Sequence, residues 1–165
     1  MLYNPLIPHN TGNIIRLCAN IGASLHLIKP LGFSLENKDL KRAALDYSDL
    51  SIVQMYSSLD EYVKTHDINR IFATMPSAHN LYSEIRYKIG DTLLFGPEDT
   101  GLPKEVEKLI PNPIKIPMQP NNRSLNLSNA VAVVSYEAWR QLKFIKKKNN
   151  WKPKPFQKNN LMNVG

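Results

Sequence analysis

Short apolar segments alternate along this chain with segments whose apolar residues recur at helical spacing, and no other feature limits the possible folds as much. The alternation predicts an α/β fold, with a largely parallel sheet flanked by helices in a single domain. Strands are predicted at Leu2–Asn4, Leu25–Ile28, Ile52–Tyr56, Arg70–Thr74, Thr92–Phe95 and Ile114–Ile116. Helices are predicted at Thr11–Ile21, Lys38–Leu45, Ser58–Thr65, Lys104–Leu109 and Leu127–Lys147. Ligands of such folds bind beyond the carboxyl ends of the strands, so polar segments that directly follow strands are the first candidates for a site.

The composition is that of an ordinary globular domain. The chain has 165 residues, of which 42% are hydrophobic and 21% are charged, enough for one sizeable core. It contains no run of about 18 apolar residues and no basic N-terminal region followed by an apolar stretch, so we expect no membrane association. Cys18 is the only cysteine, which excludes an internal disulfide and favours a cytoplasmic location. The four histidines lack ligand spacing, so no metal site is predicted.

The basic residues are concentrated at the C-terminus. The net charge is +7, yet eight Lys and Arg lie between Arg140 and Gly165, where there is no acid, and the remaining 13 basic and 14 acidic residues nearly cancel. Trp151 and Phe156 lie among these lysines. The segment is interpreted either as an RNA-binding element, with cations for phosphates and aromatic rings for bases, or as a solvated tail. We expect residues 1–148 to form the folded domain and residues 149–165 a flexible basic tail.

Two polar segments follow predicted strands in the first two thirds of the chain. The first, "NTGNIIRLCAN" (residues 10–20), offers Asn10 or Thr11 as a helix cap and places Arg16 beside apolar neighbours, either as a functional group or as a surface arginine. The second, "LLFGPEDTGLP" (residues 93–103), contains Gly96 and Gly101, which permit backbone N–H groups to approach a ligand. An ordinary turn between a strand and a helix is the alternative for this second segment.

The third segment, "QPNNRSLNLSN" (residues 119–129), contains Asn, Ser and Arg at a density that core packing does not need. Ser124, Asn126 or Ser128 could each cap the helix that follows. A cap uses one of these side chains, and the excess of polar residues indicates a binding site.

Read together, the three segments resemble the three motifs of the SPOUT class of RNA methyltransferases, over about residues 2–142. Within that class they are most similar to the small tRNA 2′-O-methyltransferases that modify the wobble nucleotide of leucine tRNAs, the YibK/TrmL group. The resemblance implies a single knotted α/β domain, in which the C-terminal segment forms a trefoil knot. It also implies a homodimer, tRNA as the partner, and S-adenosylmethionine (AdoMet) as the methyl donor, with no metal.

The resemblance also assigns roles to individual residues. It implies that Arg16 is catalytic and works at the subunit interface. The residues that it implies for AdoMet binding are Thr74, Gly96, Ile116, Ser124 and Leu125. Supporting roles fall to Asn10, Glu98, Asn126 and Tyr136.

The implied reaction is methyl transfer from AdoMet to the 2′-hydroxyl of nucleotide 34, the wobble position of leucine tRNAs. Arg16 is a poor candidate for the general base because guanidinium stays charged at every relevant pH. We therefore expect it to bind the adjacent phosphate and to stabilise charge on the 2′-oxygen. Two alternatives stay open from the sequence: a 2′-O-methyltransferase acting on another tRNA or rRNA site, and a non-catalytic RNA-binding protein with this fold.

Overall fold

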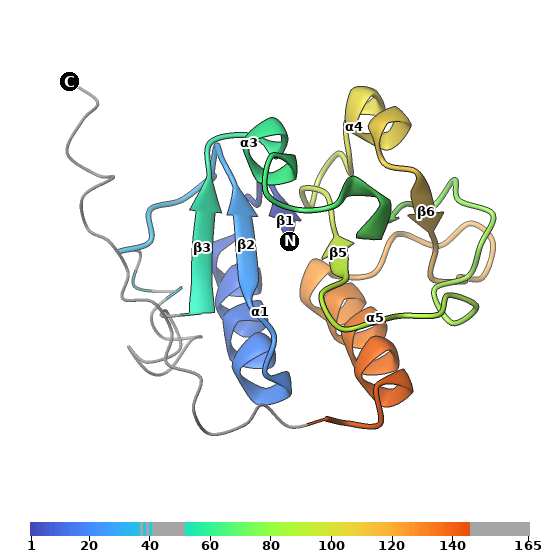
Figure 1. Cartoon of the computed structure of the whole chain (residues 1–165). Helices are drawn as coiled ribbons and strands as arrows, with labels where there is room; N and C mark the ends of the chain where they lie inside the picture. Colours follow the sequence, from blue (N-terminus) through green and yellow to red (C-terminus); the bar gives the residue numbers. More distant parts are fainter. Residues whose placement is uncertain (37, 39, 41–51, 146–165) are drawn as a thin grey trace.

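The computed structural model describes residues 1–36, 38, 40 and 52–145, and these ranges contain short strands and helices in alternation (Figure 1). The strands are β1 (Leu2–Tyr3), β2 (Leu25–Ile28), β3 (Val53–Tyr56), β4 (Ile71–Thr74), β5 (Thr92–Leu94) and β6 (Asn112–Ile114). The α-helices are α1 (Pro8–Ile21), α3 (Leu59–Val63), α4 (Lys104–Leu109) and α5 (Leu127–Gln141), and a 3₁₀ turn, η2, spans Ile68–Arg70.

The strands form two parallel three-stranded units that meet at β1 and β5. One unit has the order β1-β2-β3 and the other the order β5-β4-β6. A parallel bridge pairs Leu2 with Phe95, and the Tyr3 N–H donates to the Phe95 carbonyl at 2.9 Å. The sheet therefore runs β3-β2-β1-β5-β4-β6, which confirms the predicted α/β fold with a parallel sheet.

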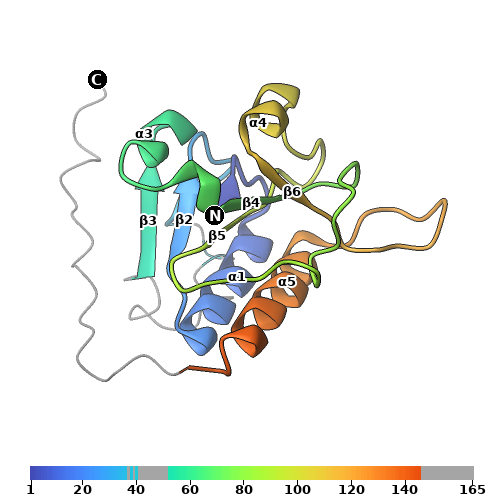
Figure 2. The same cartoon turned by 45° about the vertical axis from the view of Figure 1, so that its right-hand side comes forward.

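Alternating side chains of the strands divide between two apolar cores, one on each face of the sheet. In β4, Phe72 belongs to the core with α1 and α5, whereas Ile71 and Ala73 belong to the core with α3 and α4. Helices α1 and α5 pack against each other on one face (Figures 1 and 2). Their amino ends lie together, since Asn126 bonds to Asn10, and residues of both carboxyl ends line a common cavity.

The strand predictions hold within two residues, and two helix boundaries were wrong. Helix α1 begins at Pro8 rather than Thr11, because proline suits the first helical turn, so Asn10 and Thr11 are buried inside the helix and do not cap it. Helix α5 ends at Gln141 rather than Lys147, because Lys143 and Phe144 both have positive φ angles. Most of the helix predicted at Lys38–Leu45, and the predicted domain boundary at residue 148, lie outside the described residues. The trefoil knot stays a prediction.

Candidate active site and cofactor pocket

The segments singled out in the sequence converge on a cavity of about 660 Å³ at the carboxyl ends of the strands. Thr74 ends β4, Gly96 follows β5 by two residues, and Ile116 follows β6 by two. Because all these strands are parallel, their carboxyl ends share one edge of the sheet. The cavity lining includes Thr74, Gly96, Ile116, Ser124 and Leu125, the whole set predicted to bind AdoMet, together with Asn10, Glu98 and Asn126.

Glu98 connects the second motif to the start of α1. Its carboxylate accepts hydrogen bonds from the backbone N–H groups of Leu6 (2.8 Å) and Ile7 (3.1 Å), and from the Asn10 side-chain amide (3.2 Å). Ile7 is the N-cap residue of α1 and makes no side-chain cap of its own. A carboxylate from 91 residues away thus serves the helix terminus, where negative charge is favourable.

Asn126 connects the third motif to the same group. Its side-chain amide donates to Asn10 Oδ1 at 3.0 Å, and its own Oδ1 accepts from the Ser128 N–H at 2.9 Å, which caps α5. A continuous chain of hydrogen bonds therefore runs from Glu98 through Asn10 to Asn126 and Ser128. It joins all three motifs and fixes the amino ends of α1 and α5 relative to each other.

Gly96 is required by the protein's own backbone. A Cβ atom built at this position would lie 2.5 Å from both the Gly101 carbonyl carbon and the Leu102 nitrogen. A side chain here would collide with the returning loop. The sequence analysis expected Gly96 to make room for a ligand, and the structure supplies a second reason that lies within the chain.

The polar character of the cavity is not fully satisfied from within the protein. Thr74 Oγ1 is buried and has no hydrogen-bond partner among the described residues, and such groups usually have one. The carboxylates of Asp99 and Glu107 and the exposed guanidinium of Arg123 also line the cavity, beside apolar Ile116 and Leu125. The donor set fits a ligand with both a hydrogen-bonding part and an apolar part.

Arg16 and Tyr136 are the two predicted site residues that do not line this cavity. Arg16 is exposed on α1, six residues beyond Asn10, which is roughly 9 Å further along the helix axis. Tyr136 is 44% exposed on α5 and contacts Trp139 edge to face. Both lie on the outer surface of the α1–α5 pair.

The sequence analysis assigned no role to several residues that line the cavity. Ile7, Leu102 and Met118 contribute apolar surface, and Arg123 contributes a cation. Met118 and Arg123 lie in or next to the polar segment at residues 119–129, so that segment contained the signal. Leu102 lies in the second segment, residues 93–103, but as an apolar residue it gave no sign of its own that it lines the site.

Comparison with known proteins defines the class. The SpoU rRNA Methylase family matches residues 1–136, and the chain belongs to this family. A solved AdoMet-bound rRNA methyltransferase from Sinorhizobium meliloti superposes with a TM-score of 0.75 at 27% identity, covering 86% of this chain and 55% of that one.

More similar relatives narrow the group. A tRNA (cytidine(34)-2′-O)-methyltransferase of Methylovorus glucosotrophus is 51% identical over 146 residues, covering 87% of this chain and 95% of that protein. The Escherichia coli K12 protein of the same name is 48% identical over 144 residues, covering 86% and 92%. A solved structure described as giving insights into 2-OH methylation of C/U34 on tRNA matches with a TM-score of 0.80 at 45% identity, covering 86% and 93%.

None of the helices in the described ranges combines the length and apolar character that a membrane span requires. The same ranges contain no group of three or more His, Cys, Asp or Glu residues arranged to hold a metal ion.

Proposed function

We propose that this protein transfers a methyl group from AdoMet to the ribose 2′-hydroxyl of the wobble nucleotide, position 34, of tRNA, with leucine tRNAs as substrates. The observation that carries the proposal is the convergence of Thr74, Gly96, Ile116, Ser124 and Leu125 on one cavity. The chain is also about half identical to tRNA (cytidine(34)-2′-O)-methyltransferases over nearly their full length. A cytoplasmic location is proposed with this function.

The cavity residues fit AdoMet by their chemistry. Ile116 and Leu125 offer apolar surface for an adenine ring, and Thr74 Oγ1 offers a hydrogen bond that is unused within the chain. Asp99 places negative charge beside a ligand that carries positive charge, whereas the carboxylate of Glu107 is paired with Lys104 at 2.9 Å. When bound, AdoMet would supply an activated methyl group: the ribose oxygen gains the methyl group and releases its proton, the methyl–sulfur bond breaks, and S-adenosylhomocysteine leaves.

The chain's own contribution is then positioning and charge stabilisation. The hydrogen bonds among Glu98, Asn10 and Asn126 hold the cavity walls in one arrangement, and such preorganisation lowers the barrier to an aligned transfer. We propose that Arg16 binds the phosphate next to the target ribose with its planar fork and stabilises negative charge on the 2′-oxygen. Arg16 is not assigned the role of proton acceptor, because its guanidinium stays protonated.

A homodimer formed through the α1–α5 surface is part of the proposal. Val133 and Tyr136 expose 38% and 44% of their surface on α5, and Arg16 is exposed on the neighbouring α1. Contiguous exposed apolar side chains of this kind mark association surfaces. Sedimentation is expected to give a dimer at micromolar concentration. A fully active monomer would contradict this.

The test of the function is nucleoside mapping of tRNA by mass spectrometry. Cells that lack the protein are expected to lose 2′-O-methylation at position 34 of leucine tRNAs, and the purified protein with AdoMet is expected to restore it. Restoration at a different nucleotide would keep the chemistry and refute the substrate. Absence of AdoMet binding in calorimetry would refute the enzyme itself.

Arg16→Lys tests the proposed catalytic role. Lysine keeps the charge but loses the two-pronged hydrogen bonding, so single-turnover methyl transfer is expected to fall by roughly 100-fold, the scale of losing one transition-state donor. AdoMet affinity and melting temperature are expected to hold. Arg86→Lys, at another exposed arginine, is the matched control and should transfer at the wild-type rate. A fast Arg16→Lys enzyme would reduce Arg16 to a surface residue.

A further inference from the structure

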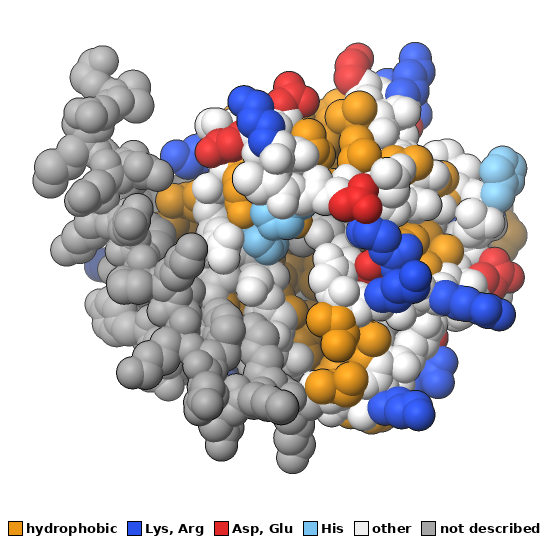
Figure 3. All heavy atoms as spheres, in the orientation of Figure 1, with side chains coloured by type: hydrophobic (Ala, Val, Ile, Leu, Met, Phe, Trp, Pro, Cys, Tyr) orange, Lys and Arg blue, Asp and Glu red, His pale blue; other side chains and the backbone are white. Residues whose placement is uncertain are grey.

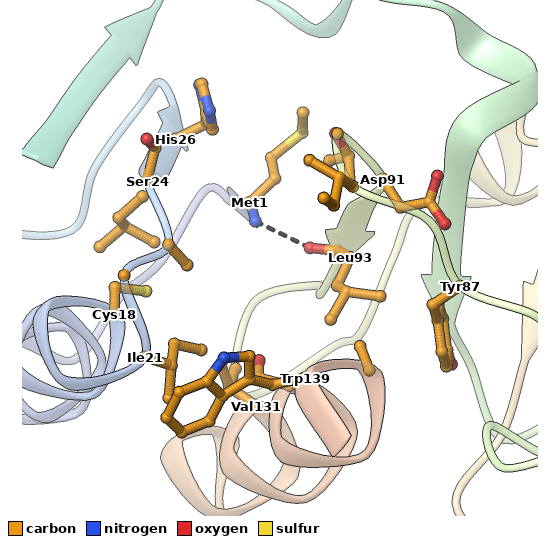
Figure 4. Close-up of a pocket in the computed structure, with 18 of the residues that line it drawn as sticks. Met1, Cys18, Ile21, Ser24, His26, Tyr87, Asp91, Leu93, Val131 and Trp139 are labelled. Atoms are coloured by element: carbon orange, nitrogen blue, oxygen red, sulfur yellow. Dashed lines mark hydrogen bonds between the residues drawn. The ribbon is translucent and has the colours of Figure 1, made fainter. Parts of the chain in front are cut away.

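A second cavity, of about 610 Å³, lies at the opposite end of α1 and α5 (Figure 4). It is bounded by the carboxyl ends of these helices, the first residues of β2 and β5, and the loop at residues 87–91. Of the described residues, only Phe95 lines both this cavity and the candidate cofactor pocket. The second cavity is therefore a separate site, for which the proposed methyl transfer has no use.

The walls of this cavity are mainly apolar. Figure 4 shows Ile21, Val131 and Trp139 on one side and Leu93 across from them. The polar lining includes the Ser24 and Ser135 hydroxyls, His26 and Asp91. A volume of this size, with apolar walls and a few polar groups, is typical of a site for a small organic group.

Large apolar side chains are exposed to solvent at the mouth of the cavity. Ile89 is 75% exposed, Phe144 50% and Ile145 54%, and both isoleucines line the cavity. Figure 3 shows apolar side chains gathered on this face over the C-terminal turns of α5. Surface of this kind normally has a partner.

The chain itself is directed to this mouth as it leaves α5. Lys143 and Phe144 adopt φ angles of 55° and 51°, a left-handed conformation that is costly for side chains other than glycine. Their backbone N–H groups bond back to the carbonyls of Arg140 (2.9 Å) and Trp139 (3.0 Å). The Trp139 indole N–H then holds the Ile145 carbonyl at 3.1 Å. The helix end is thus turned back, and Ile145, the last described residue, lines the cavity.

We propose that the indole of Trp151 occupies this cavity and ties the basic C-terminal segment to the carboxyl ends of α1 and α5. Trp151 follows Ile145 by six residues, a reach of up to about 20 Å when extended, enough to span the mouth and return. A tryptophan buries roughly 150–250 Å² and needs one acceptor for its N–H, which Ser24 or Ser135 provides. Phe156 is the other aromatic residue of the segment, but it follows Ile145 by eleven residues and comes after Pro153 and Pro155, so its closure costs more entropy.

The proposal is tested on the full chain labelled with 5-fluorotryptophan. The two tryptophans of the sequence give two ¹⁹F signals, and Trp151→Phe assigns them. The Trp151 signal is expected to be shifted from that of the free amino acid and to be broadened several-fold less by a soluble paramagnetic agent. A Trp151 signal at the free position, with full broadening, would overturn the proposal without any variant that perturbs the fold.

A pair of matched variants locates the site. Ala138 lines the cavity from α5, and Ala138→Leu fills it, so the Trp151 signal is expected to move to the free position. Ala132→Leu adds the same side chain to the same helix outside the cavity lining and is expected to leave the signal unchanged. If Ala138→Leu melts like the Ala132→Leu control but leaves Trp151 protected, the indole is bound elsewhere and the proposal fails.

Discussion

The two ends of the α1–α5 helix pair are built in opposite ways. At the amino ends, exposed backbone N–H groups need acceptors, and Glu98 and Asn126 supply them while bringing three distant segments together. At the carboxyl ends, left-handed residues close the chain: Gly22 after α1, and Lys143 with Phe144 after α5. Apolar side chains line the cavity between them. The polar end is therefore built from segments that can be recognised as motifs in the sequence. The apolar end contains no such motif and can be recognised only in the structure.

This difference also separates supporting roles from binding roles within one segment. Asn126 bonds to Asn10 through its side-chain amide and caps α5 through its side-chain oxygen, so its main part is to hold the two helices together. Ser124 and Leu125, two residues and one residue earlier, are exposed on the cavity lining. The same polar segment thus provides both the frame and the proposed contacts.

Gly96→Ala should have the largest effect, because the added Cβ collides with backbone atoms at the polar end of the helix pair. The new Cβ would meet backbone atoms of Gly101 and Leu102 at 2.5 Å, and backbone cannot rotate away as a side chain can. The loop must move, at a cost of about 1–3 kcal/mol, and AdoMet affinity in calorimetry is expected to fall at least about tenfold. Gly90→Ala is the control, since nothing lies within 4 Å of its added Cβ, although its positive φ gives it a small stability cost of its own. Unchanged AdoMet affinity in Gly96→Ala would separate this loop from the cofactor.

Glu98→Gln should have a smaller effect, because it weakens the hydrogen bonds at the polar end without removing the side chain. Glutamine keeps one acceptor oxygen but loses the charge and presents an amide to the donors of Leu6, Ile7 and Asn10. Hydrogen bonds to charged groups contribute more than neutral ones, so we expect a loss of about 1–2 kcal/mol in denaturant unfolding. Asp60→Gln, at an exposed acid of α3, should cost less. Equal losses in the two variants would show that Glu98 does not organise the site.

The sequence predicted the polar end well, and the physical reason is local. Residues after the strands carry chemistry that packing does not need, so Gly96, Ser124 and their neighbours could be located before their contacts were known, whereas Thr74 was predicted only from the resemblance to a family. The partners were not predictable, because Glu98 caps a helix 91 residues earlier in the chain, and pairing at that separation depends on strand order. Helix α1 was placed three residues late for the same reason: its cap comes from another segment.

The apolar end was not predicted at all. Its cavity is formed by ordinary core residues such as Ile14, Leu93 and Val131, whose sequence pattern is indistinguishable from that of a filled core. The end of α5 was misplaced because the sequence "QLKFIKKK" keeps helical propensity, whereas the Trp139 indole binds the Ile145 carbonyl and ends the helix. Such a tertiary contact overrides local propensity.

His26→Phe gives the smallest expected effect and tests the apolar end. Burial, assisted by the charges of the Met1 amino group and His66, lowers the pKa of His26 to about 3, against about 6.5 in an unfolded chain. Between pH 3 and pH 6.5 the unfolded chain binds a proton at His26 that the folded chain does not. The stability that neutral His26 contributes is therefore fully present above about pH 6.5 and is lost as the pH falls toward 3.

Between pH 6 and pH 5 the wild-type protein should therefore lose roughly 1 kcal/mol of unfolding free energy through this residue. His26→Phe removes the titrating group and keeps a ring beside Tyr62, which His26 contacts edge to face, so its stability should depend less on pH over that interval. His79→Phe, at an exposed histidine, should keep the wild-type slope. The measurement is urea unfolding at each pH, since chemical midpoints resolve differences of this size. Identical slopes for His26→Phe and the wild type would mean that water reaches His26, and that the apolar end of the molecule is less sealed than its lining residues indicate.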